Sequence, residues 1–514
     1  MPRLPLIDLS NTKVAVLGWI LVIVVGGISF TVYGPVNQSG AGDALDYAAM
    51  GRNLARGEGF TTSAIYPLQL SDAMNLISPH EFNPRDIPNL HRPPLLPLGY
   101  SVAYRFFGES ELIFPAVSVF FYILLLSLVW NSSGPGTHSR ATVVAILALF
   151  PPLVRQLPSG LAEIPAAVFC LAASILSIER KRSAFGSIAL GLLSGAAFLT
   201  KSYLLLLLPA FAIYLWIEGR GEGRLRAILL LVLGWTAVST PWLIRNWIVT
   251  GSPFFTLQAF CEISKGIPGY EAFRAHRGLE PIPIFPFVWN HPKEIMVKAI
   301  SSLFICARSD FGSNLLVWVC GIFVWWRLRN KPVDLAIRKL LALFLLLSGF
   351  LAVALAPINL EPRYLLPTLF PIWVLSMVGM ARVVEGSHFS KYLILLLVYF
   401  TVANFAGFLR TQHAADRRAD VPFLSARIPE NGLVVTDADG FVAWFADRPS
   451  LWLPSDEGAL EWVLDRYPVQ GVYLQEGLES PYLIHYDSTE VTFEGLRERF
   501  ERHEQTPAGG LLLY

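Results

Sequence analysis

Charged residues are scarce in this sequence. They make up 15% of its 514 residues, whereas soluble domains average about 25%. The formal net charge is only +1, so the chain lacks the basic excess that is typical of nucleic-acid-binding proteins. These two shortages argue against an ordinary soluble protein and against a nucleic-acid partner.

Several ligand signatures are also absent. The chain contains no phosphate-binding loop and no dinucleotide fingerprint, which argues against a nucleotide-sugar donor. It contains no low-complexity segment and no repeat of fixed period. No pair of histidines has a short metal-ligand spacing. A divalent metal is left open by the sequence, and its candidate ligands would be carboxylates of Asp43, Asp46 and Glu163.

Cysteine is rare, with four residues. Cys170 and Cys320 lie within apolar runs, and we interpret them as packing residues. Cys261 and Cys306 both lie in one long loop, and in an oxidising compartment they would be able to form a disulfide. The sequence leaves that disulfide open.

Apolar residues are abundant, at 54% of the chain, and the mean hydropathy is +0.49. The apolar runs recur and are long enough to cross about 30 Å of hydrocarbon. The first run, 14–36, is too long for a signal-peptide core, so we interpret it as a retained anchor helix. The sequence predicts a polytopic α-helical membrane protein with about eleven transmembrane helices. The further spans are 112–130, 141–157, 161–178, 184–200, 202–217, 227–243, 311–326, 340–357, 364–381 and 391–409.

Basic residues gather in alternate connections. With a cytoplasmic N-terminus, the cytoplasmic connections are the basic ones, as the positive-inside rule requires: 179–182, 218–226, 327–339 and 382–391. We therefore expect a multi-pass protein of the cell (inner or plasma) membrane with three extracytoplasmic pieces, which are loop 34–111, loop 244–310 and region 410–514.

The C-terminal region differs from the rest of the chain. Residues 410–514 are more polar and alternate short strand and helix patterns. They predict a small extracytoplasmic α/β domain, which leaves 1–409 as the transmembrane module. Asp437, Asp439 and Asp447 lie in turn-like contexts that favour aspartate for local backbone bonding. We expect this domain to supply no catalytic residue.

Ionisable residues collect at the predicted outer ends of the spans, although short outer turns should be poor in basic residues. Each one alone is explained by snorkelling to headgroups or by local pairing. Snorkelling does not explain the excess of cations on this side, and such groups usually face a wet cavity. The pattern predicts one charged cavity formed by Arg155, Glu163, Lys201, Arg245, Glu361 and Arg363.

The stretch GDALDYAAMGRNLARGEGF, 42–60, directly follows the first span. Asp43 is placed to cap a helix, and Asp46 follows three residues later, as in a capping box. Gly57 and Gly59 are stop signals for that helix. Capping alone accounts for the local pattern, but an aspartate on a fixed backbone also suits a positioned base.

Five stretches, in this order, resemble segments of the GT-C glycosyltransferases, in particular the branch of protein O-mannosyltransferases and lipid A aminoarabinose transferases. The resemblance covers roughly residues 10–410. The stretches are Asp43 and Tyr47 followed by NLARGEGF, then HRPPLLPLGY (91–100), GLLSGAAFLTKSYLLLLLP (191–209), PWLIRNWIVTGSPF (241–254) and EPRYLLPTLFP (361–371).

The resemblance implies a GT-C fold and an inverting transfer of a hexose or pentose at the extracytoplasmic face. The donor would be a polyprenyl-phosphate sugar, and the acceptor a hydroxyl of a glycan, lipid or protein. Asp43 matches the catalytic aspartate, and Lys201 matches the basic residue near the lipid phosphate. Many relatives have Asp followed by Glu, whereas Ala44 follows Asp43 here, so the role of Asp46 as second acid is open.

Other residues match this pattern less directly. Arg363 and Tyr364 match the Arg-Tyr pair of the late outer turn, and Glu163 resembles an acid that often starts the fourth helix. The remaining candidates are Arg245 and Arg155 as further phosphate-binding cations, and Tyr47, His91 and Arg92 as other site residues.

The residue types suit such a reaction. An acceptor hydroxyl is a poor nucleophile, so a carboxylate within hydrogen-bond reach must take its proton. A departing phosphate needs cations, or a metal, in a water-poor site. A secondary transporter or lipid flippase would instead place ionisable groups near the bilayer midplane. A non-catalytic scaffold of the same fold is the other alternative. Convergence of Asp43, Lys201 and Arg363 on one cavity separates the enzyme from both.

Overall fold

The structure of the chain is a computed structural model. The residues that it describes are 12–33, 42–132, 137–178, 183–218, 223–271, 273–330, 335–383, 386–411, 417–486 and 489–514. The basic connection 179–182 and parts of the other three basic connections lie outside these residues, so the predicted orientation in the membrane stays a prediction.

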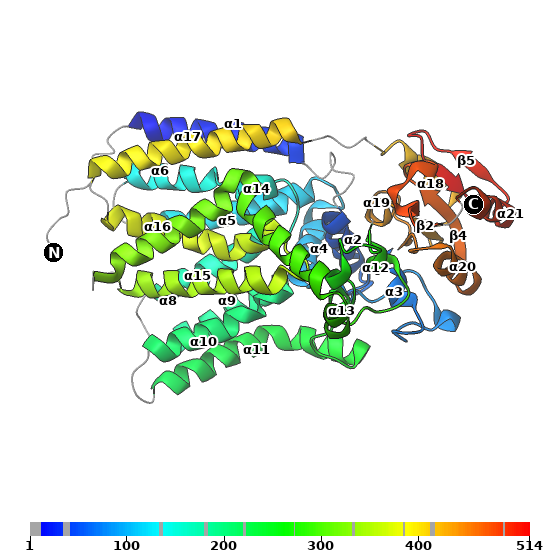
Figure 1. The fold of residues 1–514 in the computed structure, drawn as a ribbon, viewed down its shortest axis with the longest axis horizontal. Coiled ribbons are helices and arrows are strands. Elements are labelled where there is room, and N and C mark those ends of the chain that lie inside the picture. The colour runs from blue at the N-terminus through cyan, green and yellow to red at the C-terminus, as the bar shows by residue number, and fades with distance from the viewer. Residues whose placement is uncertain are drawn as a thin grey trace.

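Long apolar helices lie side by side and form a bundle (Figure 1). A helix lies at every predicted span. Among the described residues, seven helices are long and apolar enough to cross a membrane, and three further apolar helices are shorter. This confirms a polytopic α-helical membrane fold. The bounds are α1 Thr12–Tyr33, α5 Ile113–Ser132, α6 Thr137–Ala148, α7 Pro151–Gln156, α8 Glu163–Ile178, α9 Ala184–Thr200, α10 Leu207–Glu218, α11 Gly223–Thr250, α14 Pro292–Arg327, α15 Leu335–Leu355, α16 Leu366–Val383 and α17 Gly386–Arg410.

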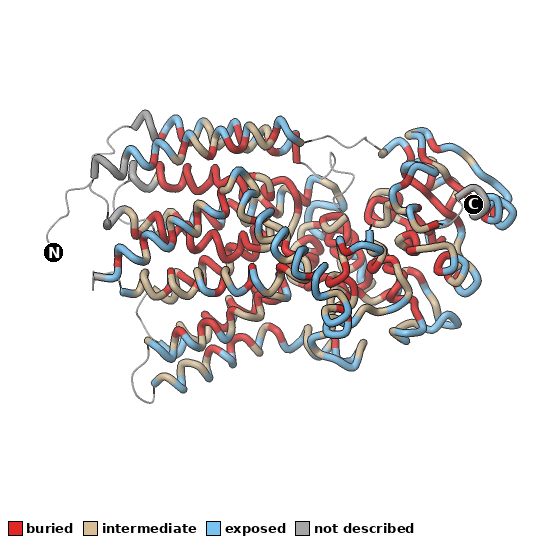
Figure 2. Tube along the Cα trace, viewed as in Figure 1, coloured by how far each residue is buried: buried red, intermediate tan, exposed pale blue. Residues whose placement is uncertain are grey.

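The outside of the bundle is apolar. Large side chains such as Ile23, Leu346 and Leu409 are 72%, 74% and 89% exposed, which suits contact with lipid rather than water. The buried residues follow the inner sides of the helices and the region where the bundle meets the outer loops (Figure 2).

Two predicted helical segments differ in detail from the structure. The predicted span 141–157 is divided into α6 and α7, because the second helix begins at Pro151 and proline cannot continue a preceding helix. Helix α14 is kinked where Asp310, Phe311 and Gly312 take left-handed backbone angles. Its first part, 292–304, is helical and carries exposed apolar residues such as Met296, as a helix lying on a membrane surface requires.

Glycines allow α9 and α11 to pack backbone against backbone. A Cβ on Gly191 would lie 2.1 Å from the carbonyl oxygen of Leu231, and a Cβ on Gly234 would lie 2.2 Å from that of Ile188. Small residues permit this close approach between membrane helices. The packing fixes α9, whose C-terminal end carries Lys201.

The outer loops cover one end of the bundle (Figure 1). The elements there are α2 Gly42–Arg56, β1 Ala64–Ile65, α3 Pro67–Leu70, α4 Leu95–Phe107, α12 Arg274–Arg277 and α13 Ile284–Asn290. Gly57 and Gly59, with φ of 87° and 77°, follow α2 as the sequence predicts.

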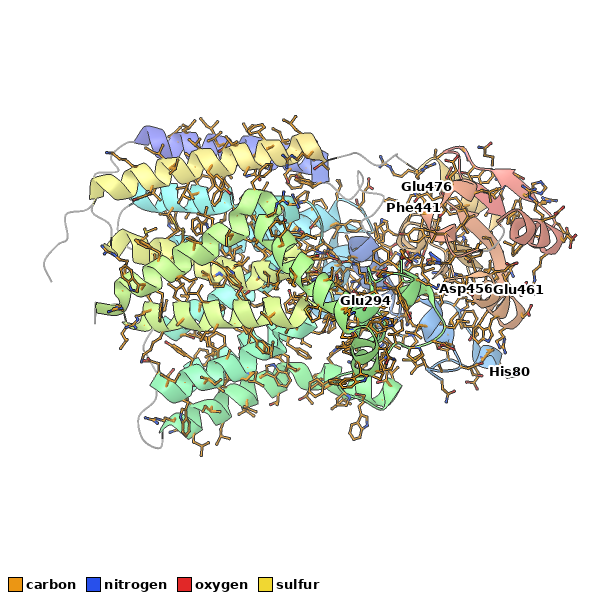
Figure 3. All side chains as sticks on the ribbon, in the orientation of Figure 1. His80, Glu294, Phe441, Asp456, Glu461 and Glu476 are labelled. Carbon is orange, nitrogen blue, oxygen red and sulfur yellow. The ribbon has the colours of Figure 1, made fainter. Side chains whose placement is uncertain are left out.

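The C-terminal region is an α/β domain beyond these loops. Its elements are α18 Asp420–Arg427, β2 Leu433–Thr436, α19 Asp439–Phe445, β3 Ser450–Trp452, α20 Glu457–Arg466, β4 Val469–Leu474, α21 Thr489–Arg499, β5 His503–Gln505 and β6 Leu511–Leu513. The residues of α18 and α19 pack on one face of the sheet, and those of α20 and α21 on the other. Phe441 lies on the side of the domain nearest the bundle, and Glu461 lies further out (Figure 3).

The sheet joins the C-terminal domain to the first outer loop. Its strand order is β1-β3-β2-β4-β6-β5, and β1 pairs in parallel with β3, Ala64 opposite Ser450. The first outer loop thus supplies the edge strand of the C-terminal sheet.

The four cysteines are all free. The Cys261 thiol donates to the carbonyl oxygen of Leu257 at 3.5 Å, and Cys306 lies within helix α14. The disulfide that the sequence left open between them is absent.

Candidate active site

Two adjoining chambers lie where the bundle, the outer loops and the C-terminal domain meet. The outer chamber has a volume of about 190 Å³ and is lined by all three parts of the molecule. The inner chamber has a volume of about 250 Å³ and reaches the helix ends of the bundle. The two share a wall formed by Asp43, His91, Arg92, Gln258, Glu262, Asn359 and Tyr364.

Asp43 lies in this shared wall and is held by two arginines. Its Oδ1 accepts a hydrogen bond from Arg92 Nη2 at 2.6 Å, and its Oδ2 accepts one from Arg363 Nη2 at 2.7 Å. Helix α2 begins at Gly42, so Asp43 is in the first turn and not at the N-cap that the sequence predicted. The carboxylate oxygens of Asp43 accept hydrogen bonds from these two guanidinium groups rather than from the backbone of α2.

The electric field of the site keeps Asp43 ionised. Burial raises the pKa of this carboxyl, but the positive charges of Arg92 and Arg363 outweigh burial and hold the pKa well below its ordinary value. Nearby cations favour the charged form of an acid in this way. Asp43 is therefore an anion that can accept a proton only weakly while both arginines face it.

Asp46 lies one turn further along α2 and is 5% exposed. Its Oδ2 accepts from Nη2 and Nε of Arg92 at 2.9 and 3.2 Å. Burial raises the pKa of Asp46 to about 6, although Arg92 opposes the rise. Two acids on one helix thus share an arginine while their environments push their pKa values apart, a pattern found at acid–base sites.

Lys201 ends helix α9 and enters the inner chamber. Its Nζ lies 2.9 Å from Oε1 of the fully buried Glu163, and 5.4 Å from the centre of the Tyr364 ring. Arg363 Nε lies 3.7 Å from the same Glu163 oxygen. One buried carboxylate therefore holds two cations beside Asp43.

Arg363 lies in a short 3-10 helix, Pro362–Leu365. Its Nε also donates to Glu361 Oε2 at 2.7 Å, and the other oxygen of Glu361 accepts from Lys265 Nζ at 3.1 Å. The sequence-predicted residues thus lie close together but do not share one cavity. Asp43 and Tyr364 line both chambers, Lys201 lines the inner one and Arg363 the outer one, and the buried Glu163 lies beside Lys201 and Arg363 without lining either.

Two predicted cations have partners elsewhere. Arg155 Nη2 lies 2.7 Å from Asp310 Oδ1, at the kink of α14. Arg245 donates to the carbonyl oxygens of Asn89 and Phe60 at 2.7 and 3.2 Å. Arg155 and Arg245 do not line either chamber, and Arg245 instead ties the first outer loop to α11.

Tyr47 and His91 surround the arginine that holds Asp43. Tyr47 is buried and lines the inner chamber, with the Arg92 guanidinium 5.4 Å from its ring centre. His91 stacks on Tyr66 at 4.6 Å. Burial, with the charge of Arg92, holds the pKa of His91 well below its ordinary value, so its imidazole is neutral.

The second outer loop adds residues that we did not predict. Glu262 Oε2 accepts from Asn359 Nδ2 at 2.7 Å, and its Oε1 lies 3.4 Å from His276 Nε2. Burial raises the pKa of Glu262, but the hydrogen bond and charge of His276 lower it to about 2. These residues have no motif or regular spacing in the sequence, and only the fold brings them together.

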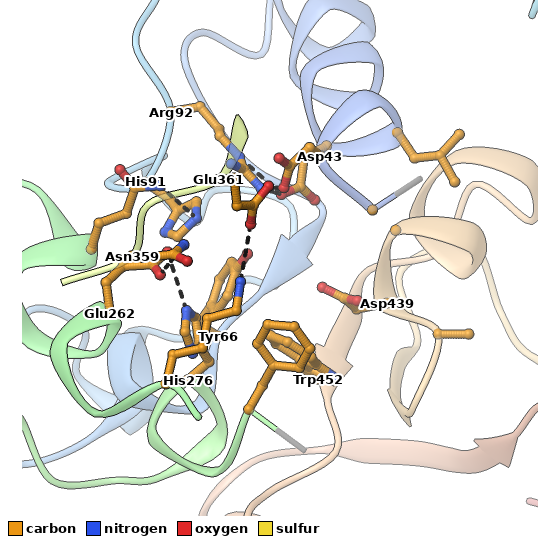
Figure 4. Close-up of a pocket in the computed structure, with 18 of the residues that line it drawn as sticks. Asp43, Tyr66, His91, Arg92, Glu262, His276, Asn359, Glu361, Asp439 and Trp452 are labelled. Atoms are coloured by element: carbon orange, nitrogen blue, oxygen red, sulfur yellow. Dashed lines mark hydrogen bonds and ion pairs between the residues drawn. The ribbon is translucent and has the colours of Figure 1, made fainter. Parts of the chain in front are cut away.

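The C-terminal domain also lines the outer chamber. Asp437, Asp439, Trp452 and Tyr482 belong to its wall, and Figure 4 shows Asp439 pointing into the cavity between Asp43 and Trp452. Gly440 lies against the start of α2, where a Cβ would lie 3.3 Å from Leu45 Cβ and 3.4 Å from the backbone of Gly42. The sequence interpretation of the TDADG stretch as a simple turn missed its place at the site.

Asp447 fixes the contact between α2 and the C-terminal domain from outside the chambers. Its Oδ1 lies 2.9 Å from Nη2 of the buried Arg52, and its Oδ2 lies 2.9 Å from Nη1 of Arg56. Arg52 also donates to the carbonyl oxygens of Trp444 and Ala443 at 2.8 and 2.6 Å. Helix α2, which carries Asp43, is thus bound to the C-terminal domain along its length.

No group of three or more His, Cys, Asp or Glu side chains with the geometry of a metal site occurs among the residues that the structure describes. The carboxylates that the sequence proposed as ligands, Asp43, Asp46 and Glu163, are each paired with arginine or lysine. The donor set therefore does not match a preformed metal centre.

No family model matches the chain, and a search of curated proteins finds no match either. Solved structures do match its fold. ArnT from Cupriavidus metallidurans bound to undecaprenyl phosphate has a TM-score of 0.58 at 14% identity, over 98% of this chain and 98% of that chain. The archaeal oligosaccharyltransferase AglB from Archaeoglobus fulgidus, in complex with an inhibitory peptide and a dolichol-phosphate, has a TM-score of 0.55 at 11% identity, over 96% of this chain and 74% of that chain. Both are GT-C superfamily members, so the chain has the GT-C fold that the sequence predicted.

Proposed function

We propose that this protein is a membrane glycosyltransferase that moves a sugar from a polyprenyl-phosphate donor to an acceptor hydroxyl, with Asp43 as general base and inversion at the anomeric carbon. The observation that carries the proposal is that Asp43 lines two adjoining chambers, with Lys201 in the inner one and Arg363, its ion-pair partner, in the outer one. The proposal also includes an extracytoplasmic site and a C-terminal domain on that side of the membrane.

The inner chamber suits the lipid phosphate of the donor. Lys201 lines it, and Arg363 lines the adjoining outer chamber with its guanidinium 5.4 Å from the centre of the shared Tyr364 ring. Two cations therefore flank the wall between the chambers, where the phosphate oxygens would lie. Ile284, Leu355 and Ile358 supply apolar surface on the same chamber, which suits the first units of a prenyl chain. Fixed cations in a water-poor site stabilise a departing phosphate without reorganisation.

The reaction follows from the position of Asp43 between the chambers. The acceptor hydroxyl enters from the outer chamber, and Asp43 takes its proton. The acceptor oxygen forms a bond to the anomeric carbon on the face opposite the phosphate. The bond between that carbon and the phosphate oxygen breaks, and polyprenyl phosphate leaves with the electron pair, which inverts the anomeric configuration.

Donor binding would also activate the base. In the ligand-free arrangement Arg363 is shared by Asp43 and Glu361. A bound phosphate beside Arg363 and Lys201 adds negative charge, which offsets the field that holds the pKa of Asp43 low. The carboxylate then becomes a stronger base when the donor is in place.

The test is cleavage of polyprenyl-phosphate sugars by the purified protein. Each member of a panel of polyprenyl-phosphate hexoses and pentoses is incubated in detergent with the protein and a mixture of hydroxyl acceptors (an oligosaccharide, a serine-containing peptide and a lipid), and the release of polyprenyl phosphate is measured. We expect release with at least one donor and its loss in Asp43→Asn. Movement of donor across a liposome membrane without any cleavage would contradict the proposal and favour a lipid flippase.

A further inference from the structure

We propose that the outer chamber binds one sugar ring of the acceptor, stacked on Trp452 and hydrogen-bonded by Asp439, so that the acceptor of this protein is a glycan. This inference rests on the proposed function and names the acceptor class of the same site. It is carried by an aromatic wall, by polar groups without partners and by the size of the chamber.

Trp452 is the centre of the aromatic wall. Its ring lies 5.6 Å from Tyr66, 5.7 Å from Phe273, 6.0 Å from His276 and 5.9 Å from Tyr482. All five line the outer chamber, and they come from the first outer loop, the second outer loop and the C-terminal domain. The face of an aromatic ring carries partial negative charge. The C–H bonds of a sugar ring, polarised by neighbouring oxygens, are complementary to such a face.

Two buried polar atoms of this wall lack a hydrogen-bond partner among the residues that the structure describes. Asp439 beside them accepts hydrogen bonds from backbone N–H groups, including that of Gly440, and it lines the chamber. Trp452 Nε1 and His276 Nδ1 are buried without a hydrogen-bond partner. Buried polar groups are normally hydrogen-bonded, and leaving one unpaired is unfavourable. Sugar hydroxyls, which both donate and accept, would supply partners of each kind.

The protonation of Asp439 favours a neutral hydroxyl over a cationic group. Burial, together with the negative charge of Asp46, raises the pKa of Asp439 to about 7. Near neutral pH this carboxyl is therefore protonated for much of the time, and it can donate as well as accept. An ammonium group would require the ionised form, whereas a hydroxyl is bound by both forms.

The size of the outer chamber and the adjoining sheet edge argue against a peptide. The chamber volume of about 190 Å³ is below the roughly 300 Å³ at which sites begin to enclose drug-sized ligands, so it suits one ring. Peptides commonly bind by adding a strand to a sheet edge, and the nearest edge strand, β1, has two residues. Because Asp43 lines the same chamber, a hydroxyl of a ring held there would lie within reach of the base.

Binding of free sugars tests the inference without any donor. Saturation-transfer NMR is recorded for the purified full-length protein with glucose, galactose, mannose, N-acetylglucosamine and arabinose. We expect ring C–H signals from at least one sugar, at least about tenfold weaker affinity in Trp452→Leu, and most of the affinity retained in Trp452→Phe. Trp462→Leu, a tryptophan of the same domain outside both chambers, is the matched control and should bind as the wild type does.

Two results of this experiment would overturn the inference. One is the absence of signal from every sugar in folded wild-type protein. The other is equal sugar affinity in Trp452→Leu and Trp462→Leu. Thermal unfolding of each variant shows whether it is folded, and Trp452→Phe keeps the test valid where the leucine variant is not.

Transfer kinetics then separate this inference from the proposed function. Using a donor that the protein cleaves, three acceptors are compared: an oligosaccharide, a serine-containing peptide and a lipid without sugar. We expect transfer to the oligosaccharide, with the KM for that acceptor raised about tenfold or more in Trp452→Leu and kcat changed less. Transfer to the peptide or the sugar-free lipid with the same KM in wild type and Trp452→Leu would overturn the glycan acceptor and leave the glycosyltransferase standing. Cleavage of no donor would count against the glycosyltransferase, and the NMR measurement would still judge the sugar site.

Discussion

Arg363 Nη2 lies 2.7 Å from Asp43 Oδ2 although 320 residues separate them in the chain. Asp43 follows the first membrane helix, and Arg363 precedes helix α16. Their contact joins the proposed base to a proposed phosphate ligand before any substrate is bound. The chemistry of the site therefore depends on how these two charges are redistributed when the donor arrives.

Asp43→Asn tests the assignment of the base. The amide keeps the shape of the side chain and its contacts to Arg92 and Arg363 in part, so folding should persist. Because an amide cannot take a proton, we expect single-turnover transfer to fall by about 10²-fold or more. Asp46→Asn is the matched comparison and should be milder. A near wild-type rate in Asp43→Asn with an inactive Asp46→Asn would show that the base is the other aspartate.

Lys201→Met removes one of the two cations and leaves the buried Glu163 with Arg363 at 3.7 Å. We expect transfer to fall by about 10²–10³-fold and stability to fall by about 3–5 kcal/mol, because one partner of a buried ion pair is lost. Combining it with Glu163→Gln should restore the melting temperature but not transfer. Recovery of both in the double variant would assign Lys201 a structural role only.

Asp447→Ala tests how α2 is held to the C-terminal domain. It leaves the buried Arg52 with carbonyl partners but without its carboxylate. We expect a loss of about 1–3 kcal/mol, less than for a fully buried pair because the Asp447 side chain is 34% exposed. Limited proteolysis and thermal unfolding measure the change. Asp465→Ala, which breaks an exposed pair with Arg499, should have little effect, and equal losses in both variants would contradict the role given to Asp447.

Asp439 should make stability depend on pH. Its pKa is about 7 in the folded chain, where burial and Asp46 raise it, against 3.8 for an ordinary aspartate. Between these values the folded state keeps a proton that the unfolded state has released, so this group makes the free energy of unfolding fall as pH rises through that window. Asparagine does not titrate. The melting temperature of Asp439→Asn relative to wild type should therefore be higher at pH 8 than at pH 5, and the exposed control Asp465→Asn should show no such difference.

Reporter fusions test the orientation in the membrane. Because the basic connections are predicted to be cytoplasmic, alkaline phosphatase fused after Arg410 should be active and a fluorescent reporter fused there should be dark. The reverse pair of results is expected for fusions within 219–222. Fluorescence after Arg410 would place the C-terminal domain in the cytoplasm and contradict an extracytoplasmic site.

The sequence allowed the membrane fold and one half of the site to be predicted. Long apolar runs indicate membrane helices directly, because a segment that crosses lipid must satisfy its backbone polar groups internally and therefore forms a helix. Asp43, Lys201 and Arg363 lie in stretches whose order resembles that of known enzymes. The glycines before Lys201 allow α9 to pack closely on α11, and this packing positions Lys201.

The other half of the site could not be found in this way. Asp439 and Trp452 reach the outer chamber only because β3 pairs with β1 and α19 rests on α2. Neither of these contacts produces a recognisable pattern in the local sequence. The stretch that contains Asp439 is equally compatible with a simple turn and with the wall of a chamber. The arginines that bind the Asp43 carboxylate are likewise distant in the chain, 49 and 320 residues away, so no local pattern indicates them.

The pairing of β1 with β3 also has a consequence for biogenesis. Ser450 Oγ donates to the carbonyl oxygen of Ser63 across 387 residues of chain, so the ribosome makes the first outer loop long before its strand partner exists. The outer chamber cannot be complete while the membrane helices are being inserted, since Trp452 and Tyr482 of its wall are synthesised after the last helix of the bundle, α17. A nascent or truncated chain that ends before Ser450 therefore carries Asp43 without a finished outer chamber, and under the proposed function it could not yet hold an acceptor there.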